Sequence, residues 1–170
     1  MLPGMDSAAA LRVERFLETE PVIWLSSIRQ DGAPHLVPTW FVWDGESIVI
    51  RSKPHARKVR NLAHDPRAMV ALGNADDDFD VGLLEARAEV IGVGDATPPP
   101  LPAEFAAKYR ERIDGLGITP AEFAATYSVT IRLTPVHALP WHGRSTPRSW
   151  VDAVRRAAFG RPAPAFVGAA

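Results

Sequence analysis

The sequence contains no cysteine, which removes several chemistries from consideration. Without a thiol there is no disulfide, no thiolate metal site and no cysteine nucleophile, and this composition fits a cytoplasmic location. Long apolar runs are absent too, since no stretch approaches the roughly 18 apolar residues of a membrane-spanning helix. The apolar start is soon interrupted by Arg12, Glu14 and Arg15, so we expect no secretory signal peptide.

The chain also has almost no excess charge. Its 19 Lys and Arg residues nearly balance 20 Asp and Glu residues, giving a formal net charge of −1. This balance favours neither nucleic acid nor an anionic membrane as a partner. The 170 residues, of which 46% are hydrophobic and 23% charged, suit one globular domain that buries about 70% of its unfolded surface. We therefore expect neither a nucleic-acid partner nor a membrane partner.

Short apolar runs separated by tight turns predict an antiparallel β protein. Turn signals at Gln30–Gly32 and Asp44–Glu46 join the first three runs, which we expect to form a meander. A later run alternates cleanly between small or apolar and charged residues, which is typical of a strand with one buried face. Six strands are expected in all: Val22–Arg29, His35–Trp43, Ser47–Ser52, Arg67–Gly73, Gly82–Val93 and Tyr127–Leu133.

Helical periodicity is confined to a few segments. We expect helices over residues 8–18, His55–His64, Glu104–Ile113 and Pro120–Thr126, with a stiff proline-rich linker over 95–102. The acidic residues of 73–80 lack calcium-loop spacing and the five histidines lack metal-ligand spacing, so no metal site is predicted. Six strands with few helices favour a mainly β fold, a six-stranded antiparallel barrel with peripheral helices.

The segment Ile50–Leu62 gathers positive charge where a strand ends and a helix begins. The free N–H groups and positive dipole end of such a helix attract an anion. Lysine supplies a point charge and arginine a planar fork, both suited to phosphate, and Ser52 adds a hydroxyl donor. On charge alone, a solvated basic helix face is an equally good interpretation. The cationic residues are Arg51, Lys53, Arg57, Lys58 and Arg60.

The segment Leu36–Trp43 contains a proline within a predicted strand. Pro38 removes one ladder donor, which usually marks a strand edge or a bulge. Such a break opens a slot where an aromatic ring reaches the backbone, with Thr39 as a hydrogen-bonding group and Trp40 as a wall. The alternative is an ordinary barrel strand that tolerates its proline.

Three motifs follow one another in a characteristic order. They are Pro-x-x-Trp-Leu-Ser-Ser, then Asp-Gly-x-Pro-His-x-x-Pro-x-Trp-Phe, then Arg-Ser-x-x-x-x-Arg-Lys-x-x-Asn-Leu. Together they resemble the pyridoxamine 5'-phosphate oxidase-like split-barrel proteins, and look closest to the actinobacterial branch of probable coenzyme F-420-dependent enzymes. The resemblance covers residues 15–95 and extends to the final strand and Trp141. It implies a split-barrel cofactor-binding domain over residues 1–145. Over residues 146–170, the local pattern predicts a C-terminal helix, Trp150–Phe159, and an Ala/Pro/Gly-rich mobile tail.

The resemblance also implies a homodimer with two cofactor sites between its subunits. Exposed aromatic surface from Trp24, Trp40, Phe41 and Trp43 would favour the same assembly. By resemblance, the cofactor phosphate is held by Ser52, Lys53, Arg57 and Lys58, with Arg51 and Asn61 beside it. The ring is lined by Val37, Pro38 and Thr39, and Trp141 reaches the partner's site.

Three functions are compatible with these features. The first is an F-420-dependent oxidoreductase that transfers a hydride to a small electron-poor organic substrate. The cofactor then carries the chemistry, which explains why no catalytic dyad stands out. The second uses FMN in the same pocket, and the third is a non-catalytic carrier of a flavin, haem or tetrapyrrole. Six cationic residues between Arg51 and Arg67 favour F-420, whose anionic tail needs a wider basic surface than a single phosphate.

Overall fold

A computed structural model of the chain describes residues 2, 7–74, 80–94 and 99–141. The predicted C-terminal helix Trp150–Phe159, the tail that follows it and most of the acidic loop lie outside these residues. None of the helices formed by the described residues is long and apolar enough to cross a membrane.

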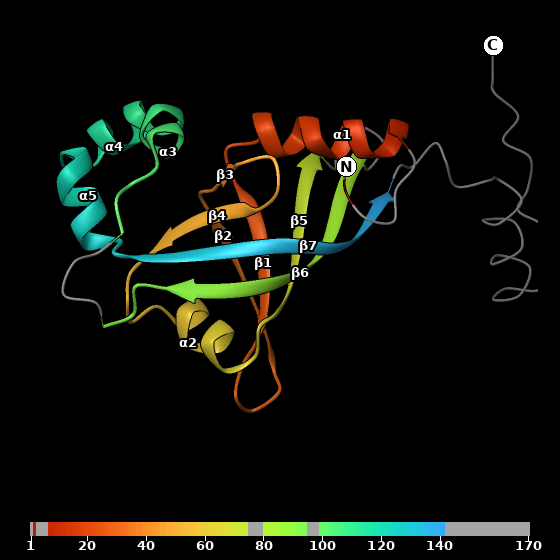
Figure 1. The fold of residues 1–170 in the computed structure, drawn as a ribbon, viewed down its shortest axis with the longest axis horizontal. Helices are drawn as coiled ribbons and strands as arrows, with labels where there is room; N and C mark the ends of the chain where they lie inside the picture. Colours follow the sequence, from red (N-terminus) through yellow and green to blue (C-terminus); the bar gives the residue numbers. More distant parts are fainter. Residues whose placement is uncertain (1, 3–6, 75–79, 95–98, 142–170) are drawn as a thin grey trace, which may run out of the picture.

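The described residues form one curled antiparallel sheet of seven strands with helices at its periphery (Figure 1). The order in the sheet is β2-β1-β5-β6-β7-β4-β3. The mainly β prediction is confirmed, and the predicted number of strands is one too few. The strands are β1 (Ile23–Ile28), β2 (Pro34–Thr39), β3 (Val42–Trp43), β4 (Ile48–Ser52), β5 (Arg67–Asn74), β6 (Asp80–Ile91) and β7 (Val129–Trp141).

The predicted meander is wrong, because the expected strand His35–Trp43 is two strands at opposite edges of the sheet. β2 pairs with β1, whereas β3 pairs with β4. Between β2 and β3, the N–H of Phe41 donates to the hydroxyl of Tyr109 at 2.8 Å. The same hydroxyl donates to the carbonyl of Phe41 at 2.7 Å. The Tyr109 side chain therefore takes the place of a neighbouring strand and leaves the barrel split at this point.

Strand β7 continues eight residues past its predicted end at Leu133. Pro135 suggests a strand end because it lacks a ladder donor. The structure accommodates it at an irregularity, where Glu85 pairs with His137 but Ala86 pairs with Pro135. One extra residue on β7 thus forms a bulge, which lets the strand continue through the proline.

Two helices pack on the barrel core. Helix α1 (Ser7–Thr19) buries Val13 and Leu17, and helix α2 (Arg57–His64) buries Val59 and Leu62 while packing against β1 and β6. The helix expected over residues 8–18 is confirmed. The alternation expected in β6 is confirmed as well, with Leu84 and Ala86 in this core.

Three short helices, α3 (Ala103–Lys108), α4 (Arg110–Gly115) and α5 (Pro120–Thr126), form a second core with β3 and β4. The helix expected over Glu104–Ile113 is broken at Tyr109, whose hydroxyl is committed to Phe41. Strand β4 is therefore buried on both faces. Ile48 and Ile50 belong to the barrel core, while Val49 packs against the helical layer.

Candidate functional site

Helix α2 begins without a side-chain cap. Its N-cap residue is Ala56, which offers no side-chain acceptor to the first N–H groups of the helix. No acidic residue lies in the first turn, which begins with Arg57 and Lys58. Uncapped N–H groups, the positive dipole end and two cationic side chains together attract an anion. The helix expected over His55–His64 is thus confirmed, starting two residues later than expected.

A cavity of about 250 Å³, here called the aromatic pocket, lies between the end of β2, strand β4, α2 and the helical layer. It brings together residues from both motif segments, namely Pro38 and Thr39 from one, and Arg51 and Lys58 from the other. Its lining residues are Pro38, Thr39, Trp40, Arg51, Lys58, Phe105, Leu116, Phe123 and Tyr127. The split in the barrel therefore places the two predicted halves of the site around one cavity.

Stacked rings make up one wall of the aromatic pocket. The ring of Trp40 lies 4.8 Å from that of Tyr109, at an angle of 4°, and 5.9 Å from that of Phe123. Phe123 in turn stacks on Tyr127 with centroids 4.3 Å apart. The rings pack face to face on one another, so this side of the cavity is apolar and aromatic. The role expected of Trp40 as a wall agrees with this geometry.

Arg51 lies in the wall of the same pocket and is only 4% exposed. Its Nη1 atom donates to Thr130 Oγ1 at 2.6 Å, and its Nη2 atom donates to the Ala124 carbonyl at 3.3 Å. Its Nε atom is buried and has no partner, and no carboxylate of the described residues pairs with the guanidinium. Burial disfavours the charged form of the guanidinium and therefore lowers the pKa of Arg51. An anion in the pocket would supply the missing counter-charge.

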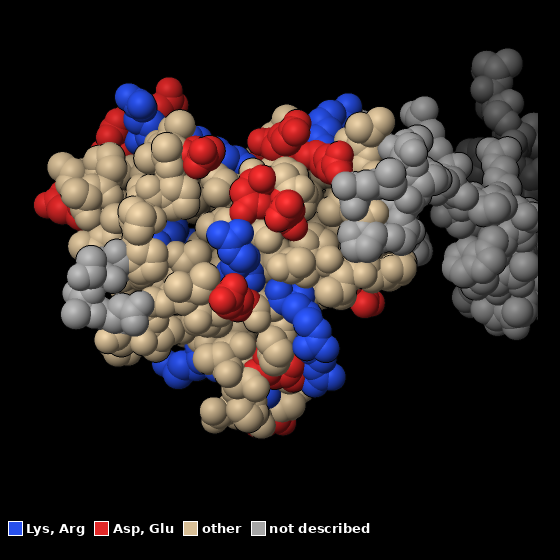
Figure 2. Space-filling view, viewed as in Figure 1, with Lys and Arg blue, Asp and Glu red and all other residues tan. Residues whose placement is uncertain are grey.

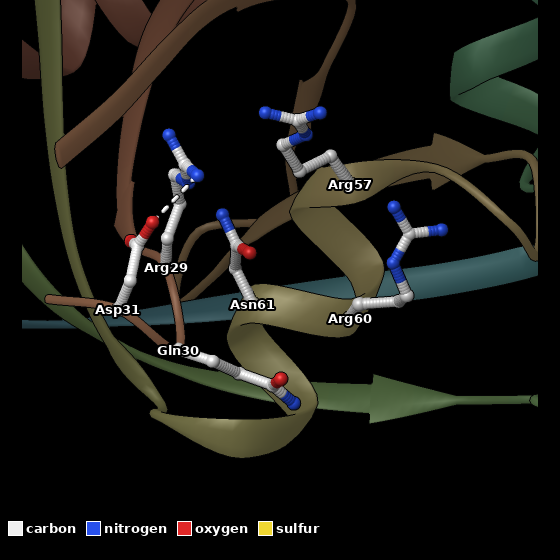
Figure 3. A pocket seen from close by; sticks show the side chains of 6 residues that line it. All are labelled: Arg29, Gln30, Asp31, Arg57, Arg60 and Asn61. Atoms are coloured by element: carbon white, nitrogen blue, oxygen red, sulfur yellow. Dashed lines mark ion pairs between the residues drawn. The ribbon is translucent and has the colours of Figure 1, made fainter. Parts of the chain in front are cut away.

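A second cavity of about 330 Å³, here called the basic pocket, lies on the other side of the α2 start. Figure 3 shows Arg29 and Asp31 of the β1–β2 hairpin facing Arg57 and Asn61 of α2 across it. Arg29 pairs with Asp31 at 2.6 Å, which leaves the pocket lining net positive. Its lining residues are Arg29, Gln30, Asp31, Arg57, Arg60 and Asn61. The consecutive residues Arg57 and Lys58 thus line different cavities.

Asn61 is buried and fixes the position of α2. Its Nδ2 atom donates to the Oγ atom of Ser27 on β1 at 3.1 Å. The hydrogen bond ties the second turn of the helix to the strand that carries Arg29 at its end. Asn61 therefore lies beside the expected phosphate site, with its amide nitrogen committed to the protein.

His35 also faces α2, and sequence reasoning did not assign it to the site. Along β2, His35, Val37 and Thr39 are less exposed than their neighbours and share the inner face. The Nδ1 atom of His35 is buried and has no partner. Burial lowers the pKa of His35, and the positive charges of Arg57, Lys58 and Arg29 lower it further. The proline-containing motif around His35 was the only signal, and it directed attention to Pro38.

Besides Val37, three of the predicted site residues line neither pocket. Ser52 is fully buried and, as the neighbour of Arg51 in β4, points to the opposite face of the strand. Lys53 is exposed, with its Nζ atom 5.5 Å from the ring of Tyr127. Trp141 ends β7 near α1 (Figure 1), roughly 35 Å along the strand from Thr130 at about 3.3 Å per residue. The backbone of Trp141 therefore lies at the opposite end of β7 from the aromatic pocket of its own subunit.

The face of the sheet seen in Figure 1 carries no extended patch of like-charged side chains. Figure 2 shows acidic and basic side chains interspersed over it, and Arg132 of β7 pairs there with Asp44 at 2.7 Å. The two cavities beside α2 differ from this face, because their basic residues outnumber their acidic ones.

Comparison with known proteins identifies the family. Residues 11–142 match the pyridoxamine 5'-phosphate oxidase family, which covers more than half of the chain. The chain belongs to this family. The match includes β2, β4 and α2, and hence the segments that line both pockets. No curated protein matches the sequence significantly.

Solved structures of the pyridoxamine 5'-phosphate oxidase family share the fold. An F-420 reductase is 26% identical, with a TM-score of 0.58 over 74% of this chain and 94% of that chain. A putative pyridoxamine 5'-phosphate oxidase from Listeria innocua is 18% identical, with a TM-score of 0.56 over 76% and 94% of the two chains. The haem storage protein HutZ from Vibrio cholerae is 14% identical, with a TM-score of 0.55 over 76% and 92%. The last two likenesses show the fold alone.

Proposed function

We propose that the chain binds a phosphate-bearing flavin or deazaflavin with its ring in the aromatic pocket and its phosphate at the start of α2. The observation that carries this proposal is the placement of an aromatic cavity and a basic cavity on either side of one uncapped helix start. Planar aromatic rings and an anion are the two chemistries that these walls suit.

The residues present fit such a cofactor. Lys58 and Arg57 would hold the phosphate, together with the first N–H groups of α2. Arg51 lines the aromatic pocket and has no carboxylate partner among the described residues, so its guanidinium would supply a positive charge beside the cofactor. Pro38, Thr39 and Trp40 would border the ring. Val37, on the inner face of β2 with Thr39, is the remaining ring contact. A contact of Ser52 or Lys53 with the phosphate remains a prediction from the sequence, since neither residue lines the aromatic pocket or the basic pocket.

The basic pocket favours coenzyme F-420 over FMN. FMN has a single phosphate, which Arg57, Lys58 and the helix start suffice to hold. The further arginines, Arg29 and Arg60, line a cavity of about 330 Å³ beyond them, which an anionic tail would occupy. Similarity to an F-420 reductase supports the same choice. FMN is the second candidate, since the aromatic pocket and the helix start serve it equally well.

The proposed activity is an oxidoreductase that transfers a hydride to a small electron-poor organic substrate. The cofactor, when bound, supplies the hydride chemistry. The chain would bind and orient it, and the aromatic residues that line the pocket would shield part of the ring from water. A non-catalytic carrier would share all of these features, so only turnover distinguishes it from the enzyme.

We also propose that two copies of the chain associate through the outer face of the sheet. Strand pairing places five apolar residues side by side across β2, β1, β5, β6 and β7. They are Pro38, Trp24, Ala71, Leu83 and Leu139, with exposed Leu36 and Met69 in the adjacent row. An apolar strip of this extent on an outer face is typical of an interface. Since Pro38 also borders the aromatic pocket, a second copy would help to close the site.

This surface differs from the one expected from the aromatic residues of the sequence. Phe41 is fully buried in the barrel core, Trp43 packs against that core, and Trp40 stacks within the helical layer. Only Trp24 of the four expected residues is well exposed, at 50%. The other three are used by the cores of the chain itself.

Titration of the purified protein with F-420 and with FMN tests the cofactor proposal. Tighter binding of F-420 is expected, with the difference shrinking in Arg29→Ala and Arg60→Ala. Equal or reversed affinities would favour FMN. If the protein binds neither cofactor, the proposal is wrong. Oxidation of the reduced cofactor by a panel of conjugated carbonyl compounds then tests the enzyme against the carrier.

A further inference from the structure

His35 is placed against the helix that forms the proposed phosphate site. It pairs in register with Ser27 of β1, and Ser27 accepts the hydrogen bond that holds Asn61 of α2. The imidazole therefore lies on the strand face that the helix covers. Its Nδ1 atom is buried without a partner, whereas such atoms are normally paired.

The charged groups that face His35 are cations. Arg29 approaches from the end of β1, and Arg57 and Lys58 approach from α2. The carboxylate of Asp31, which lines the basic pocket, is held by Arg29 at 2.6 Å. With no anion bound, partial burial and three positive charges lower the pKa of the imidazole and so favour its neutral form.

We propose that His35 takes up one proton from solvent when an anion binds at the start of α2. The inference rests on the phosphate site proposed above and concerns its regulation. An anion on Arg57 and Lys58 offsets the positive charge that opposes protonation of the imidazole. The added proton then contributes a further positive charge, and the anion, imidazolium and neighbouring cations form one network.

The consequence is a pH-dependent affinity for the anion. Below the pKa of His35 in the free protein, which lies under 6.5, the imidazole is already protonated and binding takes up no proton. Between that value and the raised pKa of the complex, binding is accompanied by proton uptake, so affinity falls as pH rises, by at most about tenfold per pH unit for one proton. The fall ends above the raised pKa of the complex, where His35 is neutral in both states.

The test uses sulfate as the probe, because sulfate remains a dianion across this pH range whereas a phosphate group titrates near 6. Sulfate binding is measured by calorimetry between pH 5.5 and 8, in two buffers with different ionisation heats. Net proton uptake of up to one per sulfate is expected for the native chain, with affinity falling as pH rises. His35→Gln keeps a polar side chain and should bind sulfate with no proton uptake. His64→Gln, at the far end of α2, is the matched control and should retain it.

The outcomes separate this inference from the proposed site. Sulfate binding that depends on Lys58 but takes up no proton would overturn the role of His35 and leave the anion site intact. Absence of sulfate binding at every pH would overturn both. Should His35→Gln fail to fold, the ring proton resonances of His35 in the native chain give the same answer. They must titrate at higher pH with sulfate than without it, and an unchanged titration contradicts the proposal.

Discussion

Arg51 and Thr130 are paired across strands β4 and β7, and the Nη1 atom of Arg51 donates to the Oγ1 atom of Thr130 at 2.6 Å. Both side chains are buried. The Nη2 atom contacts the Ala124 carbonyl of α5, so the guanidinium links the sheet to the helical layer. The remaining polar atom, Nε, is buried without a partner, and Arg51 is one of the residues that line the aromatic pocket. A residue predicted as a cofactor ligand is thus also a structural link.

Thr130→Val tests the structural part of this role. The substitution keeps the shape of the side chain and removes the acceptor, leaving a buried N–H of a charged group without a partner. Such a loss costs about 1–3 kcal/mol of the free energy of unfolding. Urea denaturation without cofactor measures it. Thr134→Val, on an exposed position of the same strand, should change stability by no more than about 0.5 kcal/mol. Equal effects of the two substitutions would contradict the assignment.

Lys58→Ala and Arg57→Ala test the anion site. Neither side chain forms a hydrogen bond or ion pair described here, so stability without cofactor should stay nearly unchanged. Each supplies a charge-assisted interaction of about 1.5–3 kcal/mol to the phosphate, so cofactor affinity should fall roughly ten- to a hundredfold. Fluorescence titration measures this loss, which should shrink in high salt. Arg87→Ala removes an exposed arginine of β6 outside both pockets and is the control. Native affinity in both variants would leave α2 as a solvated basic face.

The parts of the fold that follow from local periodicity were predictable from the sequence. Leu84 and Ala86 alternate with charged residues, and Val59 and Leu62 recur at helical spacing, so the positions of β6 and α2 follow directly. The path of residues 39–43 does not follow, because it depends on Tyr109, 68 positions further along. Pro38 and the turn at Asp44 are the local features of this segment. Neither indicates that the hydroxyl of Tyr109 separates β2 from β3.

The candidate site was predictable to a similar extent. Arg57 and Lys58 were identified because charge and a strand-to-helix transition coincide in the sequence. Their separation between two cavities depends on how α2 packs, which Ser27 and Asn61 fix through a contact between distant residues. The unpaired nitrogens of Arg51 and His35 were not predictable, because burial of one atom is a property of the assembled structure.

Tyr109→Phe tests the split in the sheet. Removing the hydroxyl leaves the buried N–H and carbonyl of Phe41 unpaired, which should cost about 1–3 kcal/mol or more of the free energy of unfolding. Tyr127→Phe, within the same aromatic cluster, should cost much less. Thermal melts of the two variants without cofactor measure the difference.

The same residue gives stability a dependence on alkaline pH. Burial raises the pKa of Tyr109 to about 12, above its ordinary value of 10.0. The folded chain therefore keeps this proton where the unfolded chain loses it. The stabilisation is complete below about pH 10 and is lost as pH rises from there toward 12. In Tyr109→Phe this component of the alkaline loss should be absent, which denaturant unfolding at pH 8, 10 and 11 measures. A loss identical in size to that of the native chain would contradict the assignment.

Trp24→Asp tests the proposed interface. Trp24 is half exposed and lies beside Pro38 and Ala71 in the apolar row, so a charge there would be buried by a second copy and left unpaired. Light scattering at micromolar concentration should give the mass of a dimer for the native chain and of a monomer for the variant. Because Pro38 borders the aromatic pocket, loss of the second copy should also weaken cofactor binding. Leu11→Asp places the same charge on an exposed apolar position of α1, outside this row, and should leave both properties unchanged. A native chain that is monomeric at this concentration would contradict the interface, and a dimer that persists in Trp24→Asp would place it on another surface.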